Sequence, residues 1–205
     1  MTHRDELDRW AALMNLRGIA GLGARETEDE KLIVEYGMID EFANTVNHFS
    51  NTQISNIVAE EPPLPDFSCE VSGQKLHLEL TEFVDPSLLK QAKHIVKTPT
   101  EPLYNEALGF ETSFDWFSEL LQTTIEMKNQ KYMNRDTQID VLLIWNEALQ
   151  VGIEDTARWL KRFEVQGISS ITSVYFQSWY HPSYIVRPTW SLKAHPLLGD
   201  IKFFQ

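Results

Sequence analysis

Cysteine and long apolar runs are nearly absent from this chain. Cys69 is the only cysteine among 205 residues, so no internal disulfide can form. No apolar run approaches the roughly 20 residues of a membrane-spanning helix, and no signal peptide precedes the first predicted helix. These absences favour a cytoplasmic protein that does not span a membrane.

Several catalytic signatures are also missing. The chain has no Gly-rich phosphate loop, no zinc-type cluster of cysteine and histidine, and no Ser-His-Asp pattern. His181 and His195 each precede a proline and lack the spacing of metal ligands, so we expect them in turns. Three common enzyme chemistries therefore have no support in the sequence.

Positive charge is scarce. Lysine and arginine number 18 against 30 aspartates and glutamates, so the formal net charge is −12. A protein that binds nucleic acid by itself usually carries a basic patch, because phosphate contacts supply most of the affinity. The acidic balance argues against broad non-specific DNA binding, but it is compatible with a small metal-dependent site.

The composition is that of one folded domain. Hydrophobic residues make up 42% of the chain and aromatic residues 11%, which excludes general disorder. The length also suits a single domain. We expect residues 1–205 to form it, with N-terminal helices over 3–46, a core over 53–145, and a C-terminal helix and strands over 153–205.

The order of apolar patterns predicts an α/β protein with a mixed β-sheet flanked by helices. The nearly unbroken apolar run 138–145 is typical of a central strand covered on both faces. A helix before it would make a parallel crossover beside the preceding hairpin. The other expected elements are an edge strand over 53–59, an extended lead-in over 60–63, helices over 85–97, 114–133 and 154–164, and strands over 168–177 and 184–192.

The hairpin is predicted within residues 60–82. Apolar residues alternate with polar ones over 67–71 and again over 76–80, as in half-buried strands. Ser72-Gly73 supplies a two-residue turn, and an even-length turn keeps both apolar sets on one face. In this register Val71 pairs with Gln74, and Asp66 falls opposite Glu79.

Two facing carboxylates need compensation. Directly opposed residues have Cβ atoms roughly 4.5–5.5 Å apart, and like charges there repel. A proton, a basic neighbour or a metal ion between Asp66 and Glu79 would relieve the repulsion, and Mg²⁺ suits such oxygen ligands. The alternative is a solvent-facing hairpin surface on which these residues are simply polar.

Pro65-Asp66, the hairpin, and Glu79-Leu80-Thr81-Glu82 together resemble the PD-(D/E)XK nuclease superfamily, which has the restriction-endonuclease-like fold. The resemblance implies that Asp66, Glu79 and the backbone carbonyl of Leu80 hold Mg²⁺ or Mn²⁺. It also implies metal-assisted hydrolysis of a phosphodiester in nucleic acid, with DNA the expected substrate. Thr81 departs from the pattern, because the superfamily has its catalytic lysine at that position.

The missing lysine has a candidate on the helix over 114–133. Lys128 interrupts the apolar stripe that Phe117 and Leu121 begin, so it either reaches a buried anion or snorkels outward. The resemblance also implies an extra acid on the helix before the hairpin, and Glu35 is the candidate there; its alternative is a solvated position. Possible phosphate contacts lie on a basic helix face formed by Lys90, Lys93 and Lys97, which could equally be a solvated face.

Other functions remain open at this point. Thr81 and the net charge of −12 favour a catalytically degenerate, acidic binding or immunity-type protein on the same fold. An enzyme acting on a small phosphorylated molecule is a third class, and a protein partner or a homodimer is compatible with each. Binding of Mg²⁺ or Mn²⁺ would separate the first two.

Overall fold

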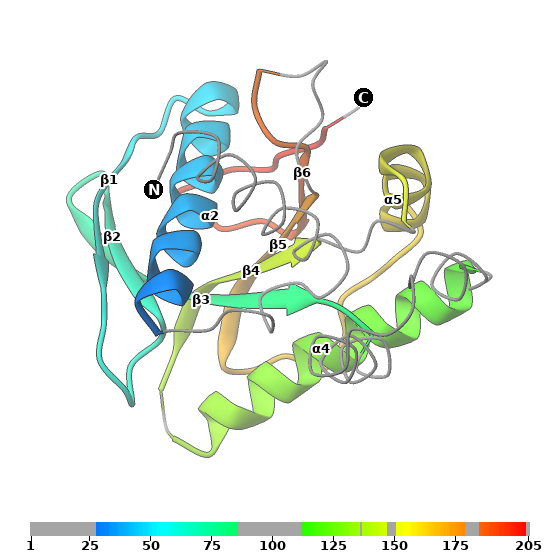
Figure 1. Ribbon diagram of the computed structural model, residues 1–205, viewed down its shortest axis with the longest axis horizontal. Helices are drawn as coiled ribbons and strands as arrows, with labels where there is room; N and C mark the ends of the chain where they lie inside the picture. Colours follow the sequence, from blue (N-terminus) through cyan, green and yellow to red (C-terminus); the bar gives the residue numbers. More distant parts are fainter. Residues whose placement is uncertain (1–27, 86–111, 136, 147–150, 179–184, 204–205) are drawn as a thin grey trace, which may run out of the picture.

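The computed structural model describes residues 28–85, 112–135, 137–146, 151–178 and 185–203. Within them, six strands form one mixed sheet that is flanked by three helices (Figure 1). The elements are, in chain order, α2 (Glu28–Phe49), β1 (Ile54–Ala59), β2 (Phe67–Val71), β3 (Gln74–Phe83), α4 (Phe114–Met133), β4 (Ile139–Asn146), α5 (Ile153–Leu160), β5 (Ile171–Ser178) and β6 (Thr189–Lys193).

The strands lie in the sheet in their order along the chain, from β1 to β6. Antiparallel pairs join β1 to β2, β2 to β3 and β5 to β6, whereas β3, β4 and β5 are parallel. Parallel neighbours need a crossover, and α4 and α5 lie in the two crossover connections. The predicted hairpin of β2 and β3 is confirmed. The predicted position of β4 beside β3 and the edge position of β1 are confirmed as well.

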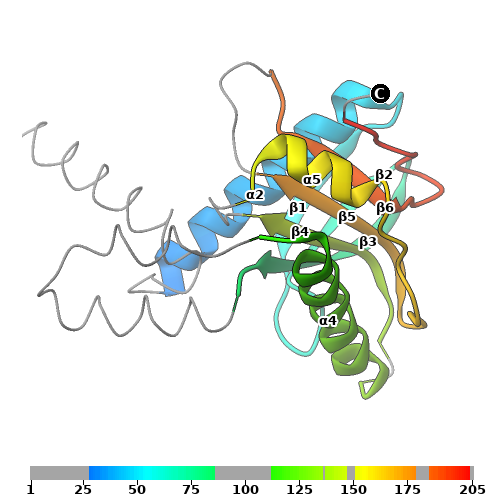
Figure 2. The same cartoon turned by 90° about the vertical axis from the view of Figure 1, so that its right-hand side faces the viewer.

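Apolar cores lie on both faces of the sheet, with α2 on one side and α4 and α5 on the other (Figures 1 and 2). On the α2 side, Phe42 packs in one cluster with Leu78 and Leu143. On the α4 side, Leu121 belongs to a cluster with Leu142. Because successive strand residues face opposite sides, β4 contributes to both clusters, which explains its unbroken apolar run.

Local sequence accounts for the turn of the hairpin and the start of α4. Ser72 and Gly73 have φ of 51° and 77°, as a two-residue hairpin turn requires, and Val71 pairs with Gln74 as predicted. The Ser113 side chain accepts a hydrogen bond from the N–H of Trp116 at 3.2 Å, which caps α4.

Some boundaries differ from the expected ones. Residues 60–63 are not an extended lead-in: the N–H of Leu64 bonds the Glu61 carbonyl at 3.2 Å across a turn that holds the cis Pro62-Pro63 bond. Leu32 of α2 is 40% exposed. β6 begins only at Thr189, because Pro188 has no N–H for the ladder.

The remaining differences concern the last third of the chain. α5 ends at Leu160 and not at 164, and β5 begins at Ile171, after a turn in which Gly167 has a φ of 65°. Residues 3–27 of the expected N-terminal helices and residues 86–97 of the helix expected over 85–97 lie outside the described residues. Within the described ranges, no helix has both the length and the apolar character needed to cross a membrane.

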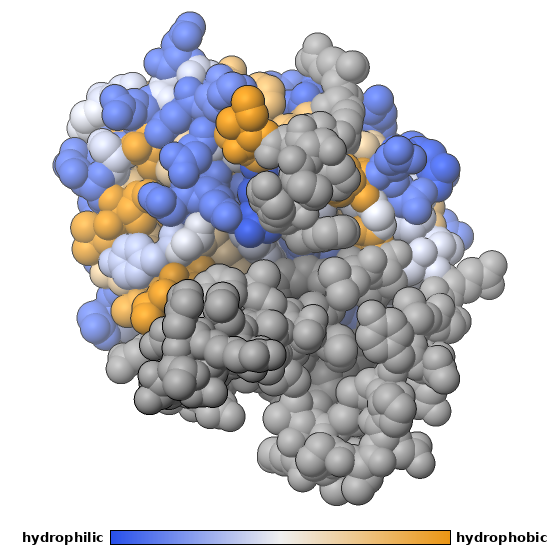
Figure 3. Space-filling view, turned by 45° about the horizontal axis from the view of Figure 1, so that its top comes forward, coloured by the Kyte–Doolittle hydropathy of each residue, from blue (hydrophilic) through white to orange (hydrophobic). Residues whose placement is uncertain are grey.

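Hydrophilic residues cover most of the described surface on the face shown in Figure 3, and the apolar groups between them are separate. Large apolar side chains that are exposed include Ile33 and Val58, which belong to α2 and β1.

Candidate active site

Asp66 directly precedes β2, and Glu79 lies in β3 beside the start of β2. β3 continues beyond this point. The first pair of this ladder joins Phe67 to Leu78, whereas β3 runs on to Phe83. One step beyond that pair, the register puts Asp66 opposite Glu79, as the sequence predicted. The last residues of β3 thus have no β2 partner on one edge.

Leu80 has its backbone groups on this unpaired edge. The register would place Pro65 opposite Leu80, but proline has no N–H with which to continue the ladder. Side chains bond the two groups instead. Asp66 Oδ2 accepts the Leu80 N–H at 2.9 Å, and Lys128 Nζ donates to the Leu80 carbonyl at 3.2 Å. Pro65 therefore leaves this carbonyl open to a cation.

Glu79 is the centre of the site and its side chain is 0% exposed. Its Oε1 accepts hydrogen bonds from Lys128 at 2.5 Å and from Lys131 at 2.8 Å, while Tyr132 donates a short hydrogen bond to Oε2. A buried carboxylate is costly without such partners. The alternative of a solvent-facing hairpin surface is wrong, because α4 covers this side chain.

The two carboxyl groups are shifted in opposite directions. Burial raises the pKa of Asp66, the charge of Glu79 raises it further, and Lys128 opposes both. Burial also acts to raise the pKa of Glu79, but the charge of Lys128 and the hydrogen bonds from Lys128, Lys131 and Tyr132 hold it below its usual value. Glu79 therefore keeps its charge more readily than Asp66 does.

One face of α4 supplies all three partners of Glu79. Lys128, Lys131 and Tyr132 are three and four residues apart, and such residues lie side by side on a helix. The parallel register pairs Glu79 with Leu142, whose side chain belongs to the core cluster on the α4 side. The expected approach of Lys128 to the carboxylates is confirmed as geometry. The hydrogen bonds from Lys131 and Tyr132 to Glu79 were not predicted, although the spacing of these residues from Lys128 was a usable signal.

The turn that carries Asp66 is fixed at several points. The N–H of Glu60 bonds the Asp66 carbonyl at 3.0 Å, and Lys75 pairs with the Glu60 carboxylate at 2.6 Å. Arg135, in the turn after α4, donates to the Pro63 carbonyl at 3.4 Å. The turn is thereby held both to the hairpin and to the segment that follows α4, so the position of Asp66 is defined.

Glu35 does not join these residues. It lies in an ion pair with Lys31 of the same helix, at 3.9 Å. Among the described residues, no three acidic, histidine or cysteine side chains form a group that could hold a metal ion. Glu35 therefore does not complete a three-acid site with Asp66 and Glu79. The expected phosphate contacts Lys90, Lys93 and Lys97 lie outside the described residues.

The donors at the site are nevertheless suited to a hard divalent cation. Two carboxylates and a carbonyl are the oxygen ligands that Mg²⁺ and Mn²⁺ take. The ammonium of Lys128 contacts both Glu79 and the Leu80 carbonyl, which shows that these two oxygens face one cation position. With Asp66 beside them, these residues fit the expected metal.

The expectation for His195 holds. The His195 side chain accepts the Leu197 N–H through Nδ1 at 3.2 Å within a turn, which is the predicted turn role, and burial lowers its pKa. Cys69 points inward, and burial raises the pKa of its thiol to about 12. His181 lies outside the described residues.

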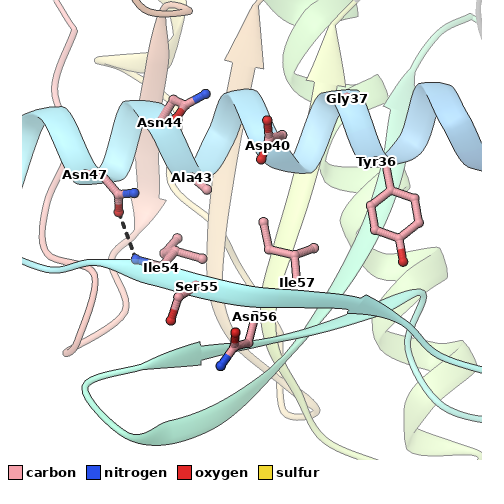
Figure 4. A pocket seen from close by; sticks show the side chains of 10 residues that line it. All are labelled: Tyr36, Gly37, Asp40, Ala43, Asn44, Asn47, Ile54, Ser55, Asn56 and Ile57. Atoms are coloured by element: carbon pink, nitrogen blue, oxygen red, sulfur yellow. Dashed lines mark hydrogen bonds between the residues drawn. The ribbon is translucent and has the colours of Figure 1, made fainter.

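A pocket elsewhere on the molecule lies between α2 and β1 (Figure 4). Asn47 points from the helix toward the strand, where its Oδ1 accepts the Ile54 N–H at 2.8 Å. Among the residues that line this pocket, Asp40 is the only charged one. This pocket therefore lacks the paired acids and the lysines that distinguish the cluster around Glu79.

Comparisons with protein-family models, with curated proteins and with solved structures found no match to this chain. The arrangement of residues around Glu79 is therefore the basis for assigning a function.

Proposed function

We propose that this chain is a Mg²⁺- or Mn²⁺-dependent phosphodiester hydrolase of the PD-(D/E)XK type that acts on nucleic acid in the cytoplasm. DNA is the first substrate to test. One observation carries the proposal: the Lys128 ammonium meets Glu79 and the Leu80 carbonyl from α4, on the sheet face where a lysine at position 81 would lie.

The order of elements supports the restriction-endonuclease-like fold. A helix, three antiparallel strands, a crossover helix and a parallel fourth strand follow one another as α2, β1 to β3, α4 and β4. Asp66 directly precedes β2 and Glu79 lies within β3. These are the positions that the two acids have in the resemblance drawn from the sequence.

Each residue would have a separate task in hydrolysis. Asp66, Glu79 and the Leu80 carbonyl would hold the metal, which supplies charge stabilisation and a more acidic water. Lys128 would orient that water or accept its proton. Lys131 and Tyr132 keep the Glu79 carboxylate in one orientation, because each bonds one of its oxygens.

Cleavage of plasmid DNA and of RNA with Mg²⁺, with Mn²⁺ and with EDTA tests the proposal. We expect metal-dependent cleavage by the wild type, and a loss of about a hundredfold or more in Glu79→Gln, Asp66→Asn and Lys128→Met. Glu70→Gln is the matched control, since Glu70 is exposed on β2 and bonds Asn56. Cleavage that survives Glu79→Gln would contradict the proposal.

A catalytically degenerate binding protein is the second candidate. It is favoured by the full set of bonds on Glu79, whose two oxygens already meet Lys128, Lys131 and Tyr132 without metal. The net charge of −12 points the same way. Calorimetric titration with Mn²⁺ separates the two: a wild type that binds no more Mn²⁺ than Asp66→Asn is a binding protein.

A further inference from the structure

We infer that Lys128 and the divalent cation occupy the same position in turn. In the metal-free protein the Lys128 ammonium fills the cation position, and metal binding moves it out toward the substrate phosphate. The inference rests on the proposed function and adds a competition between a side chain and the metal.

Geometry makes the two cations mutually exclusive. Lys128 Nζ lies 2.5 Å from Glu79 Oε1 and 3.2 Å from the Leu80 carbonyl oxygen. These are two of the three oxygens that would hold the metal. An ion held by both oxygens would lie between them, where the ammonium already is. Metal binding therefore requires the ammonium to leave.

If Lys128 moves away, the Glu79 carboxylate still has two hydrogen-bond donors. Lys131 Nζ stays 2.8 Å from Glu79 Oε1, and Tyr132 keeps its bond to Oε2. Lys131 has no bond to the Leu80 carbonyl among the contacts of the described residues, and its ammonium also lies 4.6 Å from the centre of the Tyr132 ring. Lys131 thus bonds Glu79 and not the Leu80 carbonyl, whereas Lys128 bonds both and fills the metal position.

The Lys128 side chain is partly exposed, so its ammonium can move toward solvent. Its side chain is 21% exposed, while that of Glu79 is 0% exposed, so the lysine lies on the solvent side of the carboxylate. A flexible lysine chain that leaves the metal position would carry its ammonium toward bound substrate. An anionic phosphodiester would attract it there. Metal binding would in this way free the Lys128 ammonium to contact the substrate phosphate.

Mn²⁺ titration of the wild type, Lys128→Met and Lys131→Met tests the inference. Each variant removes one positive charge beside Glu79. An effect of charge alone on the Mn²⁺ affinity would therefore be the same in both variants. If Lys128 occupies the metal position, Lys128→Met binds Mn²⁺ about tenfold more tightly or better while cleavage is lost. Lys131→Met should change the affinity by about threefold or less.

The outcomes separate this inference from the proposed function. Equal tightening in both variants, or weaker binding by Lys128→Met, overturns the competition while a cleaving wild type keeps the function. Absence of Mn²⁺ binding in all three proteins overturns both. Adding Asp66→Asn to Lys128→Met should abolish the tight binding, and tight binding that persists would place the metal elsewhere and overturn the inference. Thermal melts in EDTA check folding, with Lys128→Gln as a second variant.

Discussion

The two acids of the site differ in what they contribute to stability without metal. Asp66 has a raised pKa, chiefly through burial and the nearby charge of Glu79. Its contribution is fully present below the pKa of the unfolded chain and is lost as the pH rises through the folded pKa. Glu79 has a lowered pKa, so its contribution is present above the unfolded pKa and lost on acidification.

Asp66→Asn should therefore melt at an equal or higher temperature than the wild type in EDTA at neutral pH. Asparagine carries no charge to repel Glu79, and its carbonyl oxygen can still accept the Leu80 N–H. The advantage should grow as the pH rises through the folded pKa of Asp66, because the wild-type group loses its proton there. Thermal unfolding followed by circular dichroism measures it.

Glu79→Gln is the control with the opposite sign. It removes the charge that Lys128 and Lys131 meet, so it should lower the free energy of unfolding at neutral pH by about 1–3 kcal/mol. That deficit should shrink as the pH falls. A large loss of stability in Asp66→Asn would instead assign Asp66 a structural role as the partner of the Leu80 N–H.

At the scale of elements, the point at which β2 begins defines the site. If β2 began two residues earlier, the register would cover the Leu80 carbonyl with a ladder hydrogen bond. Pro65 prevents this, because it has no N–H to donate. The proposed metal position therefore lies at an interrupted ladder, and the interruption depends on Pro65, which would not contact the metal itself.

Pro65→Ala should close this opening in part. The new N–H can bond the Leu80 carbonyl, so Mn²⁺ affinity should fall by about threefold to tenfold, the equivalent of one net hydrogen bond. The free energy of unfolding should change by about 1 kcal/mol or less, since the added bond offsets the greater freedom of the unfolded chain. Pro188→Ala, at another buried proline before a strand, is the control and should leave the affinity unchanged.

Elements whose signal is local were the ones the sequence could predict. Alternation and a two-residue turn were enough to place Val71 opposite Gln74, and the apolar stripe predicted α4. The structure of residues 60–63 was predicted wrongly, because Pro62 and Pro63 suit an extended segment as well as a turn. The positions of the two acids and Lys128 were predicted, whereas the bonds of Lys131 and Tyr132 depend on how α4 packs on β3.

At the scale of the whole molecule, the net charge limits how the proposed nuclease could hold nucleic acid. With a net charge of −12, few phosphate contacts are available, so binding should depend only weakly on salt. Replacing Lys90, Lys93 and Lys97 by glutamine tests whether that predicted basic face contributes. If it does, the slope of log kcat/KM against log salt should become shallower by about 2 to 3, and Mn²⁺ affinity should not change.

The matched control replaces Lys31, Lys161 and Lys202, whose side chains are exposed, by glutamine. It changes the net charge equally. If the two triple variants change the slope alike, the effect comes from the overall field, and the face at residues 90–97 makes no phosphate contact.

The separation of Glu79 from its partners along the chain also has a kinetic consequence. Lys128 and Tyr132 are 49 and 53 residues away from it, whereas β2 and β3 are joined by a two-residue turn. Contacts across such long loops form late, after the hairpin. Tyr132→Phe should therefore speed unfolding by about tenfold while barely changing the folding rate, whereas Val71→Ala should slow folding. Stopped-flow measurements in denaturant would show whether the site closes only after the rest of the sheet has formed.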